Sequence, residues 1–564
     1  MRRLRTGAAA LALLGACVHA AAADVKPAVN AADTKPSTEP RVEFVVVKSD
    51  TLISLSRDVL VSPAAWREVA ALNRLSNPNR ITPGQVLRIP TRLMRATKRQ
   101  ATLISSAGDV RVGDAAATAG QRLDDGQTLQ TGAGGSAVLE LADGSRVRMP
   151  PSSLAQIVGS ESYGVRPATG GTAGATASSG GWFSGALRVM RGSVEVFATK
   201  VLRAKPLEVI TPTAVVGVRG TQFRVGLEDN ATALTHSEVI EGSTRVDTAS
   251  RAVGANVATG FGAAVDTSAR PPQVAKLLDA PDLSAVPALF ERPIVRLELP
   301  SQTNDLRVQV AADKEFERIV SDQRVEAGKE IRIAGLDDAA WYLRARRIDA
   351  AGIEGFDAAR PFTLKARPEP PVYRTPRADG KQTVGSVEFA WARNSTAPRV
   401  RLQVAEDAGF TRLVQDQDAL TETTLRADLA APGNYFWRLA SIRDNGDHGP
   451  YGDTQRFELR PMPATPSGGV AADGKSMIFK WSGRPQDRQE VQLARDATFT
   501  RISAEASLDS TEWAVPAPGS GHYFFRYRSI EPDGFVGPYS DPVDVNIPID
   551  WTPLMLLAPL LLLF

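Results

Sequence analysis

The chain has 564 residues, of which 43% are hydrophobic, so it is long enough for several globular domains. Its 66 basic and 63 acidic side chains give a formal net charge of +3. Nucleic-acid-binding proteins usually carry a strongly basic face, so this balance argues against that class and we expect no nucleic-acid partner.

The N-terminus has the pattern of an export signal. Three arginines within the first five residues precede a short apolar run at 8–16, and small residues follow it. Such a run is too short to span a membrane. We assign residues 1–23 to a signal peptide and residues 24–41, which are rich in Ala, Pro, Lys and Thr, to a linker.

Two ways of processing this leader remain open. A signal peptidase could cut after Ala20 or Ala23, or Cys17 could become a lipidated N-terminus because residues 14–17 resemble a lipobox. Cys17 is the single cysteine, so the mature chain forms no internal disulfide. We expect an exported protein of the periplasm or cell envelope, with a membrane anchor at Cys17 as one alternative.

Residues 42–92 predict a small strand–helix–helix–strand module. An apolar run at 44–47 is followed by Asp50-Thr51-Leu52, by helical spacing around 66–73, and by the closing run Ile81-Thr82-Pro83-Gly84-Gln85-Val86-Leu87-Arg88-Ile89-Pro90. This order resembles a LysM module. The resemblance implies a βααβ fold that binds N-acetylglucosamine-containing glycans, above all peptidoglycan.

In that family the sugar lies between the loop after the first strand and the loop before the last. The resemblance therefore implies glycan-binding residues in two loops of this chain, namely Ser49, Asp50, Thr51, Leu52, Asn77, Pro78, Asn79, Arg80 and Ile81. Ser49 departs from the family, which usually has glycine there. If that position needs a positive φ, serine fits poorly and the loop is reshaped.

Residues 100–267 predict an all-β domain, because short alternating runs are separated by turn signals such as Asp125-Gly126 and Asp143-Gly144. Residues 159–181 are rich in Gly, Ser, Thr and Ala, so we expect a flexible surface insertion there.

Two strings in this region resemble a FecR domain, a periplasmic β-structure often used in surface signalling. They are the runs at 185–196 and 210–225, and the second reads TPTAVVGVRGTQF at its centre. Gly217 and Gly220 flank Arg219, and glycines there allow a tight bend. Arg219 is then either an architectural residue that pairs with a carboxylate or a ligand-recognition residue.

From about residue 290 the chain repeats itself. The line Leu-Arg-Val-Gln-Val-Ala at 306–311 returns as Arg-Leu-Gln-Val-Ala at 401–405 and as Glu-Val-Gln-Leu-Ala at 490–494, and each copy is followed by an aromatic line that begins at Trp341, Tyr435 or Tyr523. Period-2 alternation and a repeat of about 90 residues favour β-sandwiches. The pattern resembles tandem fibronectin type III domains, which we place at 290–366, 368–460 and 463–548.

Within these repeats we expect Trp391 and Trp481 to lie in the cores. In the aromatic lines, alternate residues should face the core, while their arginine neighbours face solvent with their stems packed over the sheet. Residues 552–564 form an apolar tail that is too short to span a membrane as a helix.

The chain offers little for catalysis or metal binding. Its four histidines, His19, His236, His448 and His522, fall in different parts of the chain, and no metalloprotease or nucleophile-elbow motif occurs. We expect no enzyme activity, cofactor or metal site. The sequence predicts a multidomain, mainly β envelope protein that holds peptidoglycan and binds an envelope or membrane protein; the alternative is a FecR-type sensing accessory.

Overall fold

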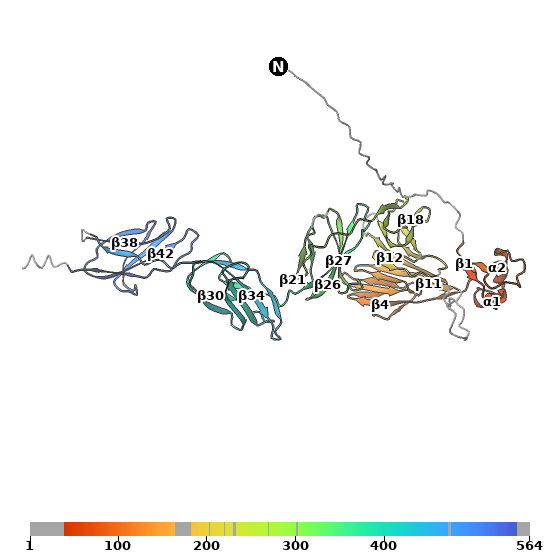
Figure 1. Cartoon of the computed structure of the whole chain (residues 1–564), viewed down its shortest axis with the longest axis horizontal. Coiled ribbons are helices and arrows are strands. Elements are labelled where there is room, and N and C mark those ends of the chain that lie inside the picture. The colour runs from red at the N-terminus through yellow and green to blue at the C-terminus, as the bar shows by residue number, and fades with distance from the viewer. Residues whose placement is uncertain are drawn as a thin grey trace, which may run out of the picture. The chain divides into compact units, whose positions relative to one another are not determined.

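The computed structural model describes residues 39–163, 182–201, 203–218, 220–228, 233–268, 270–299, 303–471 and 475–549. The expected signal peptide with Cys17, most of the expected linker, Arg219 and the apolar tail 552–564 lie outside the described residues. Figure 1 shows helices only in the N-terminal module, and strands make up the remaining described elements. Among those elements, no helix is long and apolar enough to cross a membrane.

Contacts divide the chain into two units. The first comprises Met1–Val286, Glu298–Glu330 and Tyr342–Pro361, and the second comprises Pro287–Leu297, Ile331–Trp341 and Phe362–Phe564. The division passes through the first of the three repeats, because its strands are shared between the units.

The N-terminal module has the predicted βααβ order. Its elements are β1 (Arg41–Val45), α1 (Leu52–Asp58), the 3-10 turn η1 (Pro63–Ala65), α2 (Trp66–Leu72), β2 (Val86–Pro90) and the 3-10 turn η2 (Thr91–Leu93). Strands β1 and β2 are antiparallel, and alternate residues of β1 enter the core. That core also takes in Tyr163 and Ala204 from the next domain, and Trp182 packs against it. The rings of Phe44 and Trp182 lie 5.7 Å apart.

The next domain is all β, as predicted. Its strands are β3 (Ala96–Lys98), β4 (Ala101–Ala107), β5 (Val110–Val112), β6 (Ala115–Ala116), β7 (Arg122–Leu123), β8 (Thr128–Thr131), β9 (Ser136–Glu140), β10 (Arg146–Met149), β11 (Leu154–Tyr163), β12 (Trp182–Phe197), β13 (Leu207–Ile210), β14 (Ala214–Val218), β15 (Gln222–Leu227), β16 (Thr235–Glu241), β17 (Ser243–Thr248), β18 (Gly254–Ala258), β19 (Phe261–Val265) and β20 (Gln273–Lys276).

These strands close into a barrel around one apolar core. One ladder runs β6-β5-β8-β11-β12-β13-β14-β17-β18, and the other runs β7-β4-β9-β10-β12-β15-β16-β19-β20. The long strand β12 belongs to both and changes ladder at Gly192, whose φ of +74° favours glycine.

The prediction of a flexible insertion at 159–181 is wrong for its first five residues. Residues 159–163 belong to β11 and pair with both β12 and β3. Their small and polar side chains fit a strand because this stretch is hydrogen-bonded on both sides. Residues 164–181 lie outside the described residues.

The first repeat contains β21 (Leu289–Phe290), β22 (Val295–Leu297), β23 (Asp305–Ala311), β24 (Ile319–Val325), β25 (Ile331–Ile333), β26 (Ala339–Ile348) and β27 (Ala358–Leu364). Its larger sheet has the order β21-β27-β26-β23-β24, and β22 pairs with β25. Strands β23 and β24 and most of β26 belong to the first unit, together with the barrel.

The second and third repeats are each built from two sheets around an aromatic core. Their strands are β28 (Tyr373–Thr375), β29 (Gly380–Thr383), β30 (Gly385–Trp391), β31 (Arg399–Ala405), β32 (Leu413–Leu420), β33 (Thr424–Leu429), β34 (Gly433–Ile442), β35 (His448–Tyr451) and β36 (Gln455–Arg460), then β37 (Ser467–Val470), β38 (Ser476–Lys480), β39 (Arg488–Ala494), β40 (Ile502–Leu508), β41 (Glu512–Pro516), β42 (Gly521–Ile530) and β43 (Val543–Ile547). Trp391 and Trp481 are 1% and 8% exposed, which confirms the prediction that both lie in cores.

Candidate functional site

The two loops expected to bind glycan lie at the same end of the small sheet. The antiparallel register ends with Val45 opposite Val86, so the chain leaves β1 where it enters β2. Two backbone hydrogen bonds continue the pairing, from Val46 N to Gln85 O at 2.9 Å and from Gly84 N to Val46 O at 2.8 Å. The fold therefore holds both loops next to the same pair of strand ends.

Several polar side chains of these loops stabilise the loops themselves. Thr51 caps α1 by accepting the Ser54 N–H, and the Ser54 hydroxyl accepts the Thr51 N–H in return. Asp50 Oδ2 accepts the Val47 N–H at 2.8 Å, and Asn77 Oδ1 accepts the Asn79 N–H at 3.0 Å. These groups fix the shape of the loops.

Other groups of the loops remain available. Asn79 and Arg80 are exposed, and their side chains have no partner among the described residues. Ser49 is also exposed, while Pro78 and Ile81 are half-buried. The expectation that Leu52 contacts the sugar is wrong, because at 3% exposure its side chain belongs to the module's core and is closed to a ligand.

Apolar side chains that were not predicted from the sequence lie near these loops. Val45, Val47 and Val86 are 55%, 42% and 48% exposed, and Ile53, directly after Leu52, is 69% exposed. A shallow sugar site needs apolar surface beside its hydrogen-bonding groups. The alternation along β1 could have predicted these exposed valines, because Val42, Phe44 and Val46 are buried and the residues between them face outward.

Gly217 and Gly220, the two glycines of the string at 210–225, have different structural roles. Gly220 has a φ of +67°, and a Cβ there would lie 2.7 Å from Lys200 Cγ, so the turn requires glycine. Gly217 instead lies within β14, paired with Glu208 and Arg245, so the expected bend does not begin there. The third member, Arg219, is outside the described residues.

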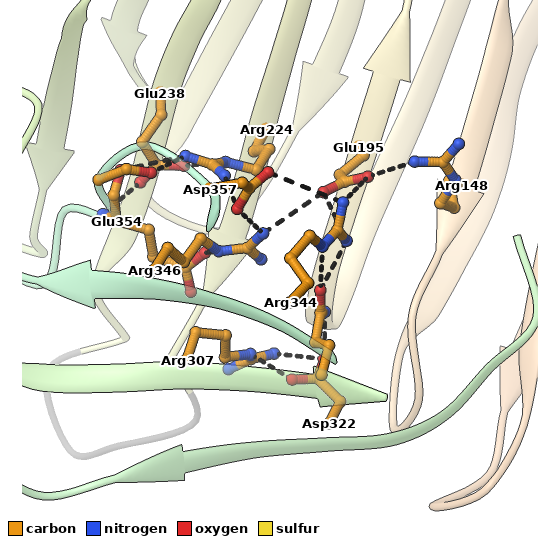
Figure 2. A network of polar contacts seen from close by, with 12 residues as sticks. Arg148, Glu195, Arg224, Glu238, Arg307, Asp322, Arg344, Arg346, Glu354 and Asp357 are labelled. Carbon is orange, nitrogen blue, oxygen red and sulfur yellow. Dashed lines mark hydrogen bonds and ion pairs between the residues drawn. The ribbon is translucent and has the colours of Figure 1, made fainter. Parts of the chain in front are cut away.

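A cluster of buried charges lies between the barrel and the first repeat, within the first unit. Figure 2 shows arginines and carboxylates from both domains joined into one network: Arg148, Glu195, Arg224 and Glu238 from the barrel, and Arg307, Asp322, Arg344, Arg346, Glu354 and Asp357 from the repeat. None of the four histidines, nor any motif, pointed to this cluster.

Glu195 is the centre of the network. Its carboxylate lies 2.8 Å from Arg148 Nη1, 3.0 Å from Arg344 Nη2 and 3.5 Å from Arg346 Nη1. Arg224 reaches the repeat from the other side, since its Nη2 donates to the Glu354 and Gly355 carbonyl oxygens at 3.1 and 2.7 Å. The prediction that the arginines of the aromatic line face solvent is therefore wrong for Arg344 and Arg346, because the barrel covers them.

The arginines keep the buried carboxylates charged. Burial alone would raise the pKa of Glu195, but Arg344, Arg346 and Arg148 hold it below its usual range. The same balance lowers the pKa of Glu354, where Arg346 and Arg307 oppose the effect of burial. Each carboxylate thus remains an ionised partner although it is buried.

His236 lies beside this network. It is 6% exposed, and its Nδ1 lies 2.7 Å from Glu238 Oε1. Burial works to lower the pKa of His236, but the Glu238 carboxylate raises it above the usual value. Across the described ranges there is no group of three or more His, Cys, Asp and Glu side chains that could hold a metal ion.

Comparison with known proteins identifies two domains. Residues 44–90 match the LysM domain model, and residues 127–245 match the FecR protein model. A LysM domain suggests peptidoglycan binding, a FecR domain suggests signalling with a partner, and both are typical of cell-envelope proteins. The domains detected are non-catalytic.

Solved structures with similar regions were also found. A proposed anti-sigma factor from Parabacteroides distasonis is 17% identical, with a TM-score of 0.20; the match covers 26% of this chain and 59% of that protein. The FN1–FN3 domains of chicken CNTN1 are 13% identical, with a TM-score of 0.21, over 46% of this chain and 95% of that one. The fibronectin(III)-like modules of Clostridium thermocellum CbhA are 11% identical, with a TM-score of 0.20, over 32% and 95%. No curated protein matches this chain.

Proposed function

We propose that this protein is a non-enzymatic component of the cell envelope that binds peptidoglycan through the loops at 49–52 and 77–81. The observation that carries this proposal is the pair of exposed side chains, Asn79 and Arg80, which have no partner among the described residues and lie within the LysM match. An amide and a guanidinium can bond the N-acetyl and hydroxyl oxygens of a sugar, while the nearby valines and Ile53 supply apolar surface.

The test is retention of the purified protein on insoluble peptidoglycan. The double variant Asn79→Ala/Arg80→Ala should lose about tenfold or more in affinity, because each lost hydrogen bond is worth about 1 kcal/mol and 1.4 kcal/mol is tenfold. Arg67→Ala is the matched control, since Arg67 is an exposed arginine of α2 in the same module. Equal retention of the double variant and the control would refute the assignment of these loops.

The absence of catalysis is part of the proposal and has its own test. We expect no clearing in a peptidoglycan zymogram loaded with this protein, since no catalytic motif was found in the sequence and the detected domains are non-catalytic. A cleared band at the position of the intact chain would overturn this point.

We propose that the protein is exported, because residues 1–23 have the pattern of a signal peptide. The site at which this peptide is removed can be measured. Mass spectrometry of the mature N-terminus distinguishes cleavage after Ala20 or Ala23 from a lipidated Cys17. Either product supports export, whereas an intact Met1 in the mature protein contradicts it.

A second candidate function is signalling with a membrane partner. It is favoured by the FecR match at 127–245 together with the ionic network that joins this barrel to the first repeat. Crosslinking in intact cells should then recover a membrane protein, and removal of this chain should change transcription of the partner's genes. An unchanged transcript profile would count against this candidate.

A further inference from the structure

A cleft of about 560 Å³ opens beside the ionic network, between the barrel and the first repeat and inside the first unit. The barrel contributes Arg191, Ser193 and His236, and the repeat contributes Arg307, Asp322 and Glu354. This volume lies within the range of sites for small molecules, about 300–1,000 Å³. None of the candidate glycan-binding residues lines it.

The carboxylates that line the cleft are already neutralised. Glu228 lies 2.6 Å from Arg324 Nη1, and Asp322 accepts Arg307 Nη2 at 3.0 Å. Glu354 is bonded to Arg346 Nε in the buried network. No negative charge is therefore left over among the acidic side chains that line the cleft.

Its cationic side chains, in contrast, retain free donors. Arg191 is exposed at the rim and has no acceptor among the described residues. Arg307 uses Nε and Nη2 for Asp322, which leaves its Nη1 without a described partner. The cleft thus presents unused N–H groups from both domains.

His236 supplies a third donor from a fixed position. Its Nδ1 is held by Glu238, so the free atom of the ring is Nε2, which has no described partner. The ring lies across Gly226, where a Cβ would come within 2.1 Å of Nε2, so the glycine makes room for it. Burial works to lower the pKa of His236, but the Glu238 carboxylate raises it above the usual value, which favours the form of the ring that also carries an N–H at Nε2.

We propose that this cleft binds a small organic oxyanion, held by Arg191 at the rim and by Arg307 Nη1 and His236 Nε2 within. Arginine and doubly protonated histidine both donate to carboxylate or phosphate oxygens, which are the acceptors that the paired acidic side chains cannot supply. The site is separate from the proposed glycan loops and does not depend on them.

Calorimetry on the whole protein with citrate as the probe tests the proposal. We expect one citrate per chain, and we expect Arg191→Met to weaken binding about tenfold or more, as for the loss of one charge-assisted hydrogen bond. Arg188→Met is the matched control because Arg188 is an exposed arginine of the same strand that bonds Gln156 outside the cleft. Arg191→Met must also leave retention on peptidoglycan unchanged.

The histidine rings give a second readout that a general charge effect would not produce. With histidine labelled at ring Cε1, citrate should shift the resonance of His236 and leave those of His448 and His522 in place. Inorganic phosphate and a soluble acidic stem peptide of peptidoglycan are run in parallel, because the tightest of the three probes identifies the source of the anion.

The proposal fails if none of the three probes binds at concentrations up to about 10 mM. It also fails if Arg191→Met and Arg188→Met weaken binding equally, or if citrate moves all three histidine resonances together.

Discussion

Ser49 shows how a single residue can depart from a family pattern without changing the fold. Its φ is +80°, in the left-handed region where side chains other than glycine are strained. The condition stated from the sequence is therefore met: the position does require a positive φ, and serine adopts it. Asp50 and Thr51 still make the hydrogen bonds of this loop, and these bonds stabilise the strained backbone conformation of Ser49.

Ser49→Gly should stabilise the N-terminal module by about 1 kcal/mol, because glycine adopts this φ without a steric cost. In hydrogen exchange on the intact protein, amides of α1 should exchange about fivefold more slowly. Ser76→Gly is the control, since Ser76 is an exposed serine of the same module whose φ is not positive. Faster exchange in Ser49→Gly would show that the serine side chain contributes more than the strain costs.

At this scale the sequence predicted the strained position but not which side chains are covered. The resemblance to LysM modules placed Leu52 in the sugar site, yet as the first residue of α1 it turns into the core. Arg344 and Arg346 were placed in solvent by alternation, yet they face a second domain. Alternation says which residues share a face of a strand, and it does not say what lies against that face.

The three repeats share a cross-strand pair of glutamine and arginine on the outer face of their larger sheets. A glutamine lies directly across from an arginine in each, as Gln309–Arg344, Gln403–Arg438 and Gln492–Arg526. The arginine Nη2 donates to the glutamine Oε1 at 2.6, 2.7 and 2.7 Å respectively. In each repeat a phenylalanine covers one side of the guanidinium, namely Phe316, Phe410 and Phe499.

The first repeat differs on the opposite side of this guanidinium. Tyr451 and Tyr539 lie over Arg438 and Arg526 at 3.9 and 4.0 Å. Both tyrosines follow a Gly-Pro pair, and in the first repeat the same place after the turn is taken by Asp357. Arg344 instead pairs with Glu195 of the barrel at 3.0 Å and with Asp357 itself at 3.7 Å. In the first repeat an acidic residue thus stands in the place of the tyrosine, on the face that contacts the barrel.

Tyr451→Ala should destabilise the second repeat by about 1–2 kcal/mol, because Arg438 loses a stacked ring. Hydrogen exchange of β34 in the intact protein measures the effect. Tyr539→Ala should act equally on β42 and leave β34 unchanged, so the two variants serve as controls for each other. If Tyr451→Ala leaves exchange in β34 unaltered, the stack does not stabilise this sheet.

Across the whole chain, the order of modules and their mainly β character follow from sequence, because each module carries its own periodicity. The βααβ module, the all-β character of the next domain and the aromatic cores at Trp391 and Trp481 all form as predicted. The cluster around Glu195 could not be predicted in this way. Its members are far apart in sequence, and isolated Arg and Glu residues on alternating strands usually indicate a solvated face.

Glu195→Gln should weaken the barrel and the first repeat together. Removing one charge from a buried network leaves arginines uncompensated and costs about 3–5 kcal/mol. Hydrogen exchange should therefore accelerate in both β12 and β23, while β42 of the third repeat, which contributes nothing to the network, stays unchanged. Glu208→Gln is the control: Glu208 pairs with the exposed Arg251, and such surface pairs contribute about 0–1 kcal/mol. Acceleration confined to β12 would mean that the two domains unfold separately.

The same network predicts how stability depends on pH. The pKa values of Glu195 and Glu354 are lower in the folded protein than in the unfolded chain, where a glutamate titrates near about 4.3. Their contribution to the free energy of unfolding is therefore fully present above that pH and is lost as the pH falls below it, since the unfolded chain then binds protons that the folded one does not. The midpoint of thermal unfolding of the barrel should be nearly constant from about pH 6 to about pH 5, below the range in which His236 titrates, and should fall steeply below about pH 4. In Glu195→Gln the midpoint should start lower and fall less steeply, because one of the titrating groups is gone; an equally steep fall in both proteins would place the acid-sensitive groups outside this network.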